Sequence, residues 1–218
     1  LKAYQQANGG IIFPNPNAPT GIGMGLEAIE TLLQNNTDSV VIVDEAYIDF
    51  GGETAVPLTQ RYPNLLVIQT LSKSRSLAGI RVGFAIGHPE LIEALERIKN
   101  SFNPYSIDRI AERAAVAAID DVAYFESCCQ QIIDCREWTT KQLQDLGFSV
   151  LQSQANFIMA KPAGISAVDV FARLREANII VRYFNKPRIK DYLRITIGTQ
   201  AEMQALVTVL QTIMDSKS

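Results

Sequence analysis

Hydrophobic residues in the first half of the chain follow two patterns, continuous runs and helical spacing. Four continuous apolar runs predict short strands covered on both faces, as in parallel sheets. These runs lie at about residues 11–13, 39–43, 64–69 and 80–87. Between the first two runs, apolar residues recur with helical spacing from Leu26 to Leu33, which predicts a helix. We therefore expect an α/β architecture with a largely parallel sheet.

The second half begins with helices and then changes to short strands with helices between them. Pro89 opens a helix with one apolar face, and two further helices are expected at about 106–118 and 121–146, the last ending at Gly147. Capping patterns at Ser166 and Thr199 predict two more helices. Short strands are expected at 148–151, 156–160, 179–182 and 192–197.

These patterns predict two domains. Residues 1–120 would form part of an α/β large domain with a mainly parallel sheet, and residues 121–218 a C-terminal α+β small domain. The long helix at about 121–146 would bridge them.

Composition narrows the class of protein. The chain has 218 residues, of which 47% are hydrophobic and 20% charged, as in globular domains. A net charge of -3 gives no broad basic surface for nucleic acid or anionic lipid. There is no stretch of about twenty apolar residues and no signal-peptide pattern. We expect a soluble cytoplasmic protein that acts on small molecules, with no nucleic-acid or membrane partner.

Two kinds of metal or catalytic site are disfavoured. The three cysteines, Cys128, Cys129 and Cys135, lie close together in one expected helix and lack the paired spacing of a zinc site. Free thiols in a reducing cytosol are the simpler interpretation. His88 is the single histidine and precedes a helix, so a histidine-based triad or metal site is not expected.

Two segments carry the most informative chemistry. Asp44 directly follows the second apolar run, which places it at the carboxyl end of a strand, where open α/β sheets bind ligands. Lys73 follows the next run and can reach the same edge. A lysine and an acid are what an aldehyde cofactor with a ring nitrogen requires. An ordinary acidic turn and a solvated loop lysine are the alternatives that these segments leave open.

Several neighbouring side chains could complete such a site. Thr70, Ser72 and Arg81 supply two hydroxyls and a guanidinium, which suit a phosphate group, although hydroxyl-rich loops are common. Arg81 could also lower the pKa of Lys73, since a lysine must be neutral to act as a nucleophile. Asn17, in a proline-rich loop, could donate to a ligand or be a turn residue.

Three more residues have two interpretations each. Tyr47, three residues after Asp44, could face the same ligand or pack. Arg194 lies between apolar neighbours in an expected strand, so it requires a partner. That partner could be a substrate carboxylate or a buried acid of the protein. Arg182, at the end of the preceding expected strand, could be a solvated charge or face the cleft.

Four motifs, in this order, closely resemble those of fold-type I pyridoxal-phosphate enzymes, which have the aspartate-aminotransferase fold. They are Asn-Pro-Asn-Ala-Pro-Thr-Gly at 15–21, Asp-Glu-Ala-Tyr at 44–47, Thr-Leu-Ser-Lys at 70–73 with Leu-Ala-Gly-Ile-Arg at 77–81, and Leu-Arg-Ile-Thr-Ile-Gly at 193–198. Within that fold the chain resembles the histidinol-phosphate aminotransferases, over essentially its whole length. The motifs are more specific for fold and cofactor than for substrate.

The resemblance implies a role for each residue around the cofactor ring. Lys73 would bind pyridoxal 5'-phosphate covalently and, once freed by substrate, move a proton between the substrate and the cofactor. Asp44 would hold the protonated ring nitrogen. Asn17 and Tyr47 would donate to the ring 3-oxygen.

The resemblance also assigns the anion-binding residues and the reaction. Thr70, Ser72 and Arg81 would bind the cofactor phosphate, Arg194 the carboxylate of glutamate, and Arg182 the phosphate of the other substrate. The implied enzyme is a homodimeric aminotransferase of histidine biosynthesis, with L-histidinol phosphate and 2-oxoglutarate as substrates. An aromatic-amino-acid aminotransferase and a phosphothreonine decarboxylase of the same fold are alternatives, as is a non-catalytic sensor domain.

The chain also departs from this family. Family members have a long N-terminal portion that completes the cofactor pocket and reaches the neighbouring subunit, and this chain has no counterpart to it. We therefore expect the chain to be a fragment with weak or absent cofactor binding and no turnover by itself.

Overall fold

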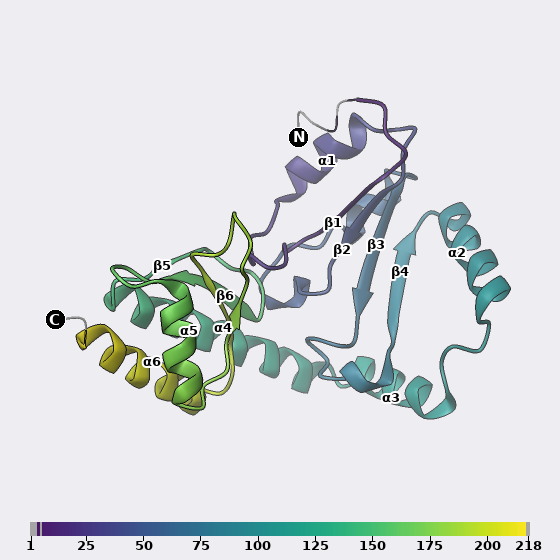
Figure 1. The fold of residues 1–218 in the computed structure, drawn as a ribbon. Coiled ribbons are helices and arrows are strands. Elements are labelled where there is room, and N and C mark those ends of the chain that lie inside the picture. The colour runs from purple at the N-terminus through teal and green to yellow at the C-terminus, as the bar shows by residue number, and fades with distance from the viewer. Residues whose placement is uncertain (1–3, 5, 217–218) are drawn as a thin grey trace. The chain divides into compact units, whose positions relative to one another are not determined.

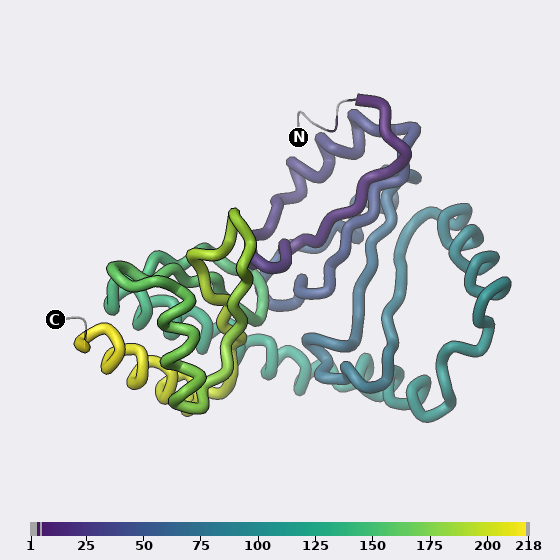
Figure 2. Tube along the Cα trace, in the orientation of Figure 1, coloured from purple at the N-terminus to yellow at the C-terminus, as the bar shows by residue number. Residues whose placement is uncertain are grey.

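The computed structural model describes residue 4 and residues 6–216, which form two compact units. Unit 1 comprises the described residues up to Asn17 together with Gly23–Ser127. Unit 2 comprises Ala18–Ile22 and the described residues from Cys128 onwards. Figure 2 traces the chain through both units. The domain boundary expected between residues 120 and 121 stays a prediction.

Unit 1 contains a four-stranded sheet in the order β1-β2-β3-β4 (Figure 1). Its strands are β1 (Ile11–Pro14), β2 (Val41–Asp44), β3 (Leu65–Thr70) and β4 (Gly83–Gly87). Strands β1, β2 and β3 pair in parallel, whereas β4 runs antiparallel to β3. Each of the four expected strands is therefore confirmed, and the sheet is largely parallel, as expected, with one antiparallel strand.

One face of this sheet is covered by α1 (Leu26–Gln34). Ile29 and Leu33 are fully buried against strand residues such as Val41 and Val43, as the helical spacing predicts. However, Ile12, on the opposite face of β1, is 70% exposed, and Phe84 of β4, on the same face as Val43, is 40% exposed. The expectation that all four strands are covered on both faces is therefore wrong for β1 and β4, since the described residues leave these two side chains in solvent.

Two further helices complete the first part of the chain. They are α2 (Pro89–Phe102) and α3 (Arg109–Asp120). His88 caps α2 by accepting a hydrogen bond from the Glu90 backbone, which gives the single histidine a structural role. The expected apolar face of α2 is present, but α2 has no buried residue and Ile98 is 69% exposed.

Unit 2 builds a separate core around an antiparallel sheet in the order β5-β6-β8-β7. Its strands are β5 (Ser149–Val150), β6 (Phe157–Lys161), β7 (Arg182–Tyr183) and β8 (Leu193–Thr196). Its helices are α5 (Ala167–Glu176), α6 (Gln200–Asp215) and the greater part of α4 (Val122–Asp145). The expected α+β organisation of this part is confirmed (Figure 1).

The capping patterns in unit 2 are confirmed, and one strand is corrected. The Ser166 hydroxyl accepts from the Asp169 backbone, and Thr199 forms a reciprocal capping box with Glu202. The strand expected at 179–182 is wrong in extent, because only Arg182 and the next residue pair with β8. The chain leaves α5 through Asn178, which has a left-handed backbone. The apolar residues 179–181 that follow it lie before the strand and not in it.

No helix within residues 4 and 6–216 has the length and apolar character needed to cross a membrane.

Candidate active site

The ends of β2 and β3 bring two predicted site residues to one edge of the unit 1 sheet. Asp44 is the last residue of β2 and Thr70 the last residue of β3. In the parallel register Asp44 lies opposite Ile68, two residues before Thr70. Asp44 Oδ1 accepts a hydrogen bond of 3.0 Å from the Ala46 backbone N–H, which fixes the start of the following turn.

Lys73 lies in a closed loop directly after β3. The Leu77 backbone N–H donates to the Leu71 carbonyl at 3.0 Å, and the Ser76 N–H donates to the Lys73 carbonyl at 3.1 Å. Lys73 is exposed, and its Nζ lies 5.5 Å from the centroid of the Tyr47 ring. The structure therefore places the lysine of the third motif beside the tyrosine of the second, although they are 26 positions apart in the sequence.

A second contact ties the lysine loop to the segment after β2. The buried Ser74 hydroxyl donates to the Asp49 carboxylate. Asp49 lies in the 3-10 helix Ile48–Phe50, which directly follows Tyr47. A hydrogen bond just beyond the Lys73–Tyr47 contact thus holds the two segments together.

The candidate phosphate-binding groups are partly assembled. The hydroxyls of Thr70 and Ser72 lie 3.0 Å apart, and the Ser72 backbone N–H also donates to Thr70 Oγ1. Arg81 has a left-handed backbone with a φ of 57°, and its Nη1 donates to the Ala78 carbonyl at 3.0 Å within the same turn. Its guanidinium is exposed. The structure thus places the two hydroxyls together and keeps Arg81 on the segment that leads into β4.

The loop that follows β1 carries Asn17, but a different asparagine closes it. Asn15 is 2% exposed and bonds Met24 in both directions, accepting from its backbone N–H at 2.6 Å and donating to its carbonyl at 3.1 Å. Asn17 is half-buried three residues after the end of β1. Sequence reasoning missed Asn15, because a second asparagine in the same motif gave no reason to prefer it.

Glu45 is the other residue at this edge that sequence reasoning missed. It is 2% exposed and accepts three hydrogen bonds. Their donors are the Thr54 hydroxyl at 2.6 Å, the Ala55 backbone N–H at 2.6 Å and the Gln69 amide at 2.8 Å. An acid next to Asp44 in the same motif was a possible signal, but none of its three partners could be identified from the sequence.

Two predicted site arginines of unit 2 lie opposite each other. Arg182 of β7 and Arg194 of β8 are register partners on neighbouring antiparallel strands. The Arg194 guanidinium carbon lies 4.7 Å from the centroid of the Phe157 ring, and its Nε is buried without a hydrogen-bond partner. None of the ion pairs formed by the described residues includes either arginine. The alternative that Arg194 pairs with a buried acid is therefore wrong for the described part of the chain.

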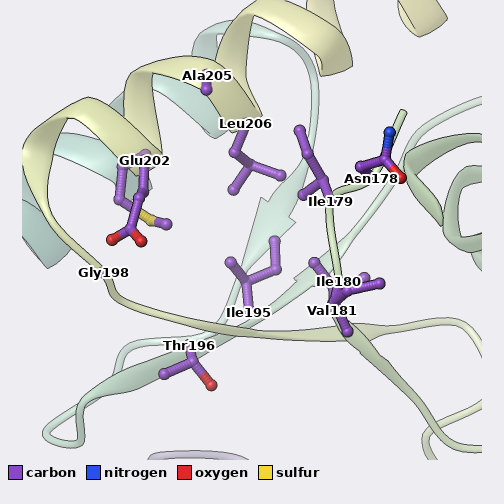
Figure 3. Close-up of a pocket in the computed structure, with 11 residues that line it drawn as sticks. Asn178, Ile179, Ile180, Val181, Ile195, Thr196, Gly198, Glu202, Ala205 and Leu206 are labelled. Carbon is purple, nitrogen blue, oxygen red and sulfur yellow. The ribbon is translucent and has the colours of Figure 1, made fainter. Parts of the chain in front are cut away.

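Unit 2 also contains an apolar cavity of about 320 Å³ between α6, β8 and the segment before β7. Figure 3 shows Leu206 reaching into it from α6 and Ile195 from β8. None of the predicted site residues lines this cavity. It is therefore distinct from the candidate site.

Comparison with known proteins identifies the family. The sequence profile described as "Aminotransferase class I and II" matches residues 1–210. The chain belongs to this family. The expected family is thus confirmed, and the order of the four motifs along the chain is explained by common descent.

Individual relatives are closely similar over nearly the whole chain. A histidinol-phosphate aminotransferase of Pseudomonas putida (strain W619) is 62% identical over 210 residues, which are 96% of this chain and 60% of that protein. Histidinol-phosphate aminotransferase 1 of Pseudomonas fluorescens (strain Pf-5) is 61% identical over 204 residues, 94% of this chain and 58% of that protein. The chain thus spans about three fifths of the length of these relatives.

A solved structure supports the same fold. The histidinol-phosphate aminotransferase of Sinorhizobium meliloti, in complex with pyridoxal-5'-phosphate, matches with a TM-score of 0.85 and 26% identity. The match covers 96% of this chain and 58% of that one. The α/β fold class expected from the sequence is therefore confirmed.

Proposed function

We propose that the complete product of the gene encoding this chain, hereafter the complete gene product, is a histidinol-phosphate aminotransferase. It transfers the amino group of L-histidinol phosphate to 2-oxoglutarate, which yields the corresponding ketone and glutamate. The observation that carries the proposal is the placement of Lys73 beside Tyr47, at the sheet edge where β2 ends in Asp44. The names of the relatives supply the substrate.

The residues at this edge suit pyridoxal 5'-phosphate as cofactor. An exposed amine, a carboxylate and two adjacent hydroxyls match its aldehyde, its ring nitrogen and its phosphate. When bound, the cofactor withdraws electrons from the substrate carbon that loses its proton. We propose Lys73 as the covalent anchor and Asp44 as the partner of the ring nitrogen.

The remaining groups orient the cofactor and manage the proton. Lys73, once released by the substrate, moves the proton at the substrate α-carbon. Tyr47 and Asn17 donate to the ring 3-oxygen. The phosphate is bound by hydroxyls and a guanidinium, those of Thr70, Ser72 and Arg81, because short charge-assisted hydrogen bonds suit its oxygens.

The arginine pair of unit 2 supports a substrate with anionic groups. Like charges opposite each other on neighbouring strands are unfavourable unless an anion lies between or beside them. The unpartnered Nε of Arg194 has the same implication, because buried polar groups are nearly always hydrogen-bonded. We propose that Arg194 binds the carboxylate of glutamate or 2-oxoglutarate and that Arg182 binds the phosphate of L-histidinol phosphate.

A direct assay tests the reaction. The complete gene product should transfer the amino group of L-histidinol phosphate to 2-oxoglutarate. This reaction should be faster than the transfer of an amino group from an aromatic donor to phenylpyruvate. Equal or higher activity with the aromatic keto acid would instead assign an aromatic-amino-acid aminotransferase. Release of carbon dioxide from phosphothreonine would assign a decarboxylase. No turnover with any of these substrates, together with ligand binding, would favour a sensor.

The cofactor can be tested separately from the reaction. Borohydride reduction of the cofactor-loaded complete gene product, followed by peptide mass analysis, should place the cofactor on the peptide containing Lys73. The 218-residue chain treated in the same way should bind much less cofactor. A label on another peptide would refute the proposed site.

Assembly and location are proposed from the same resemblance. We propose a cytoplasmic homodimer. Light scattering of the complete gene product should give twice the mass of one chain, and cell fractionation should place the activity in the soluble fraction.

A further inference from the structure

Glu45 lies between two residues of the candidate site and is itself unavailable to any ligand. It directly follows Asp44 and precedes Tyr47 by two positions, yet it is 2% exposed. Its backbone N–H donates to the Ile68 carbonyl at 2.8 Å, which extends the β2–β3 pairing by one residue beyond Asp44. Because Glu45 is buried, its side chain points into the protein from the end of β2, the strand that carries Asp44.

The three donors to the Glu45 carboxylate come from two different segments. Oε2 accepts from the Gln69 amide and from the Thr54 hydroxyl, while Oε1 accepts from the Ala55 backbone N–H. Gln69 is the residue before Thr70 at the end of β3. Thr54 and Ala55 belong to the chain that returns after the Tyr47 turn. One side chain thus links the end of β2, the end of β3 and the returning loop.

Since all three partners donate to the Glu45 side chain, both of its oxygens must act as acceptors. A carboxylate accepts at each oxygen, whereas a glutamine presents two N–H donors on one side. A glutamine at position 45 would either turn its amide toward the Ala55 N–H or turn it toward the Thr54 and Gln69 donors. In the first orientation two donors face each other inside the protein, which is unfavourable. In the second, the Thr54 hydroxyl must accept and the Gln69 amide must turn to present its oxygen, so neutral hydrogen bonds replace the charge-assisted ones of the carboxylate. Glu45 is therefore matched to its surroundings as an acceptor.

We propose that Glu45 is a positioning residue, which fixes the end of β2 with Asp44 and Tyr47 against the end of β3 that leads to Lys73. This inference rests on the proposed function, since it concerns the same site. Glu45 touches neither substrate nor cofactor, and it acts through Gln69 and the turn after Asp44. Loss of its contacts would let the Asp44 and Lys73 segments move relative to each other, and misplacement by about 1 Å costs about 100-fold in rate.

The test uses three variants of the complete gene product loaded with pyridoxal 5'-phosphate. Glu45→Gln removes the charge and forces the Thr54 hydroxyl and the Gln69 amide to reorient. The double variant Glu45→Gln with Gln69→Glu exchanges the two groups, so that an amide again faces a carboxylate and an oxygen again faces the Ala55 N–H. Glu53→Gln is the matched control, because Glu53 is exposed in the same loop. Each variant is measured for kcat, KM, thermal unfolding and the pH titration of the cofactor's visible absorbance.

The expected result is specific to positioning. Glu45→Gln should lower kcat by about 10- to 100-fold, change KM by less than about threefold and shift the midpoint of the absorbance titration. The exchange variant should recover most of kcat and of the titration midpoint. Glu53→Gln should behave like the unmodified protein in all four measurements.

Other outcomes would overturn the inference. If Glu45→Gln lowered the unfolding temperature but kept kcat and the titration midpoint, Glu45 would be merely structural. If Glu45→Gln did not fold, Thr54→Val, which removes one donor, should still lower kcat several-fold, and an unchanged kcat would refute the role. Failure of the unmodified protein to carry the cofactor on Lys73 would refute the proposed function, and the inference with it.

Discussion

The predicted site residues of unit 1 and those of unit 2 differ in how their polar groups are satisfied. At the sheet edge of unit 1, the groups bond one another, as in the Thr70–Ser72 and Ser74–Asp49 contacts. In unit 2, Arg194 lies opposite Arg182 and keeps a buried Nε with no hydrogen-bond partner. Under the proposed function, the unit 1 groups are organised before the cofactor binds, whereas an anionic substrate completes the arginine pair.

This difference has a physical basis. A group that stays bound through many turnovers benefits from donors that are held in place before it arrives. A substrate that must bind and leave can instead satisfy charges that the protein leaves unpaired. Substitutions of the proposed ligand-binding residues should therefore lower activity with little or no loss of stability, and their effects can be ranked by size.

The largest effect is expected at Lys73. Lys73→Ala in the complete gene product should lower turnover by more than about 10⁴-fold, because it removes both the covalent anchor and the proton-transfer group. The unfolding temperature should hardly change, since Lys73 is exposed. Enzyme assay and borohydride labelling measure the two losses. Lys99→Ala, an exposed lysine of α2, is the control, and retained labelling in Lys73→Ala would contradict the prediction.

Arg194 should separate the effect on activity from the effect on stability most clearly. Arg194→Met should raise KM for 2-oxoglutarate by on the order of 10²- to 10³-fold, as expected when one partner of a buried charge pair is removed. It should leave the unfolding temperature unchanged or higher, because an unpaired polar atom and a like-charge neighbour are removed. Arg175→Met on α5 is the control. A marked fall in unfolding temperature would show that Arg194 has a structural partner.

Arg182 should have a smaller, substrate-selective effect. Arg182 is exposed, so its attraction for an anion is partly screened by solvent. Arg182→Gln should raise KM for L-histidinol phosphate by about tenfold at low salt and leave KM for 2-oxoglutarate within about twofold. Steady-state kinetics at two salt concentrations measure this. An equal rise in both constants would contradict separate roles for the two arginines.

The smallest effect is expected at Glu202 of unit 2, which has no proposed role in ligand binding. The pKa of Glu202 is lowered, first by the hydrogen bond from the Thr199 backbone and then by that from its hydroxyl. Because the pKa is lower in the folded chain, this stabilisation is present above the unfolded pKa and is lost as pH falls through the folded pKa. Glu202→Gln should therefore reduce the fall of the unfolding temperature on acidification.

The control for this measurement is Glu176→Gln, an exposed acid at the end of α5. Unfolding temperatures followed from about pH 7 to about pH 3 cover the titration of ordinary carboxyl groups. An identical pH profile for the two variants would mean that the capping box contributes no pH-dependent stability.

Local features of the fold could be predicted because they depend on neighbouring residues. The caps at Ser166 and Thr199 follow from hydrogen bonds three residues apart, and they are present as expected. The strands that end in Asp44 and Thr70 follow from continuous apolar runs. The exposure of Ile12 could not be predicted, because an apolar run does not state which faces are covered.

The family, the order of strands and helices, and the identity of the candidate acid, lysine and arginines could all be predicted from the sequence. Which groups meet is seen in the folded chain alone: Glu45 contacts Gln69, Lys73 lies beside Tyr47, and Arg182 lies opposite Arg194. Motifs depend on residue type and spacing along the chain, whereas these contacts depend on strand register and loop closure. Register is set by pairing between distant segments, so no local pattern specifies it.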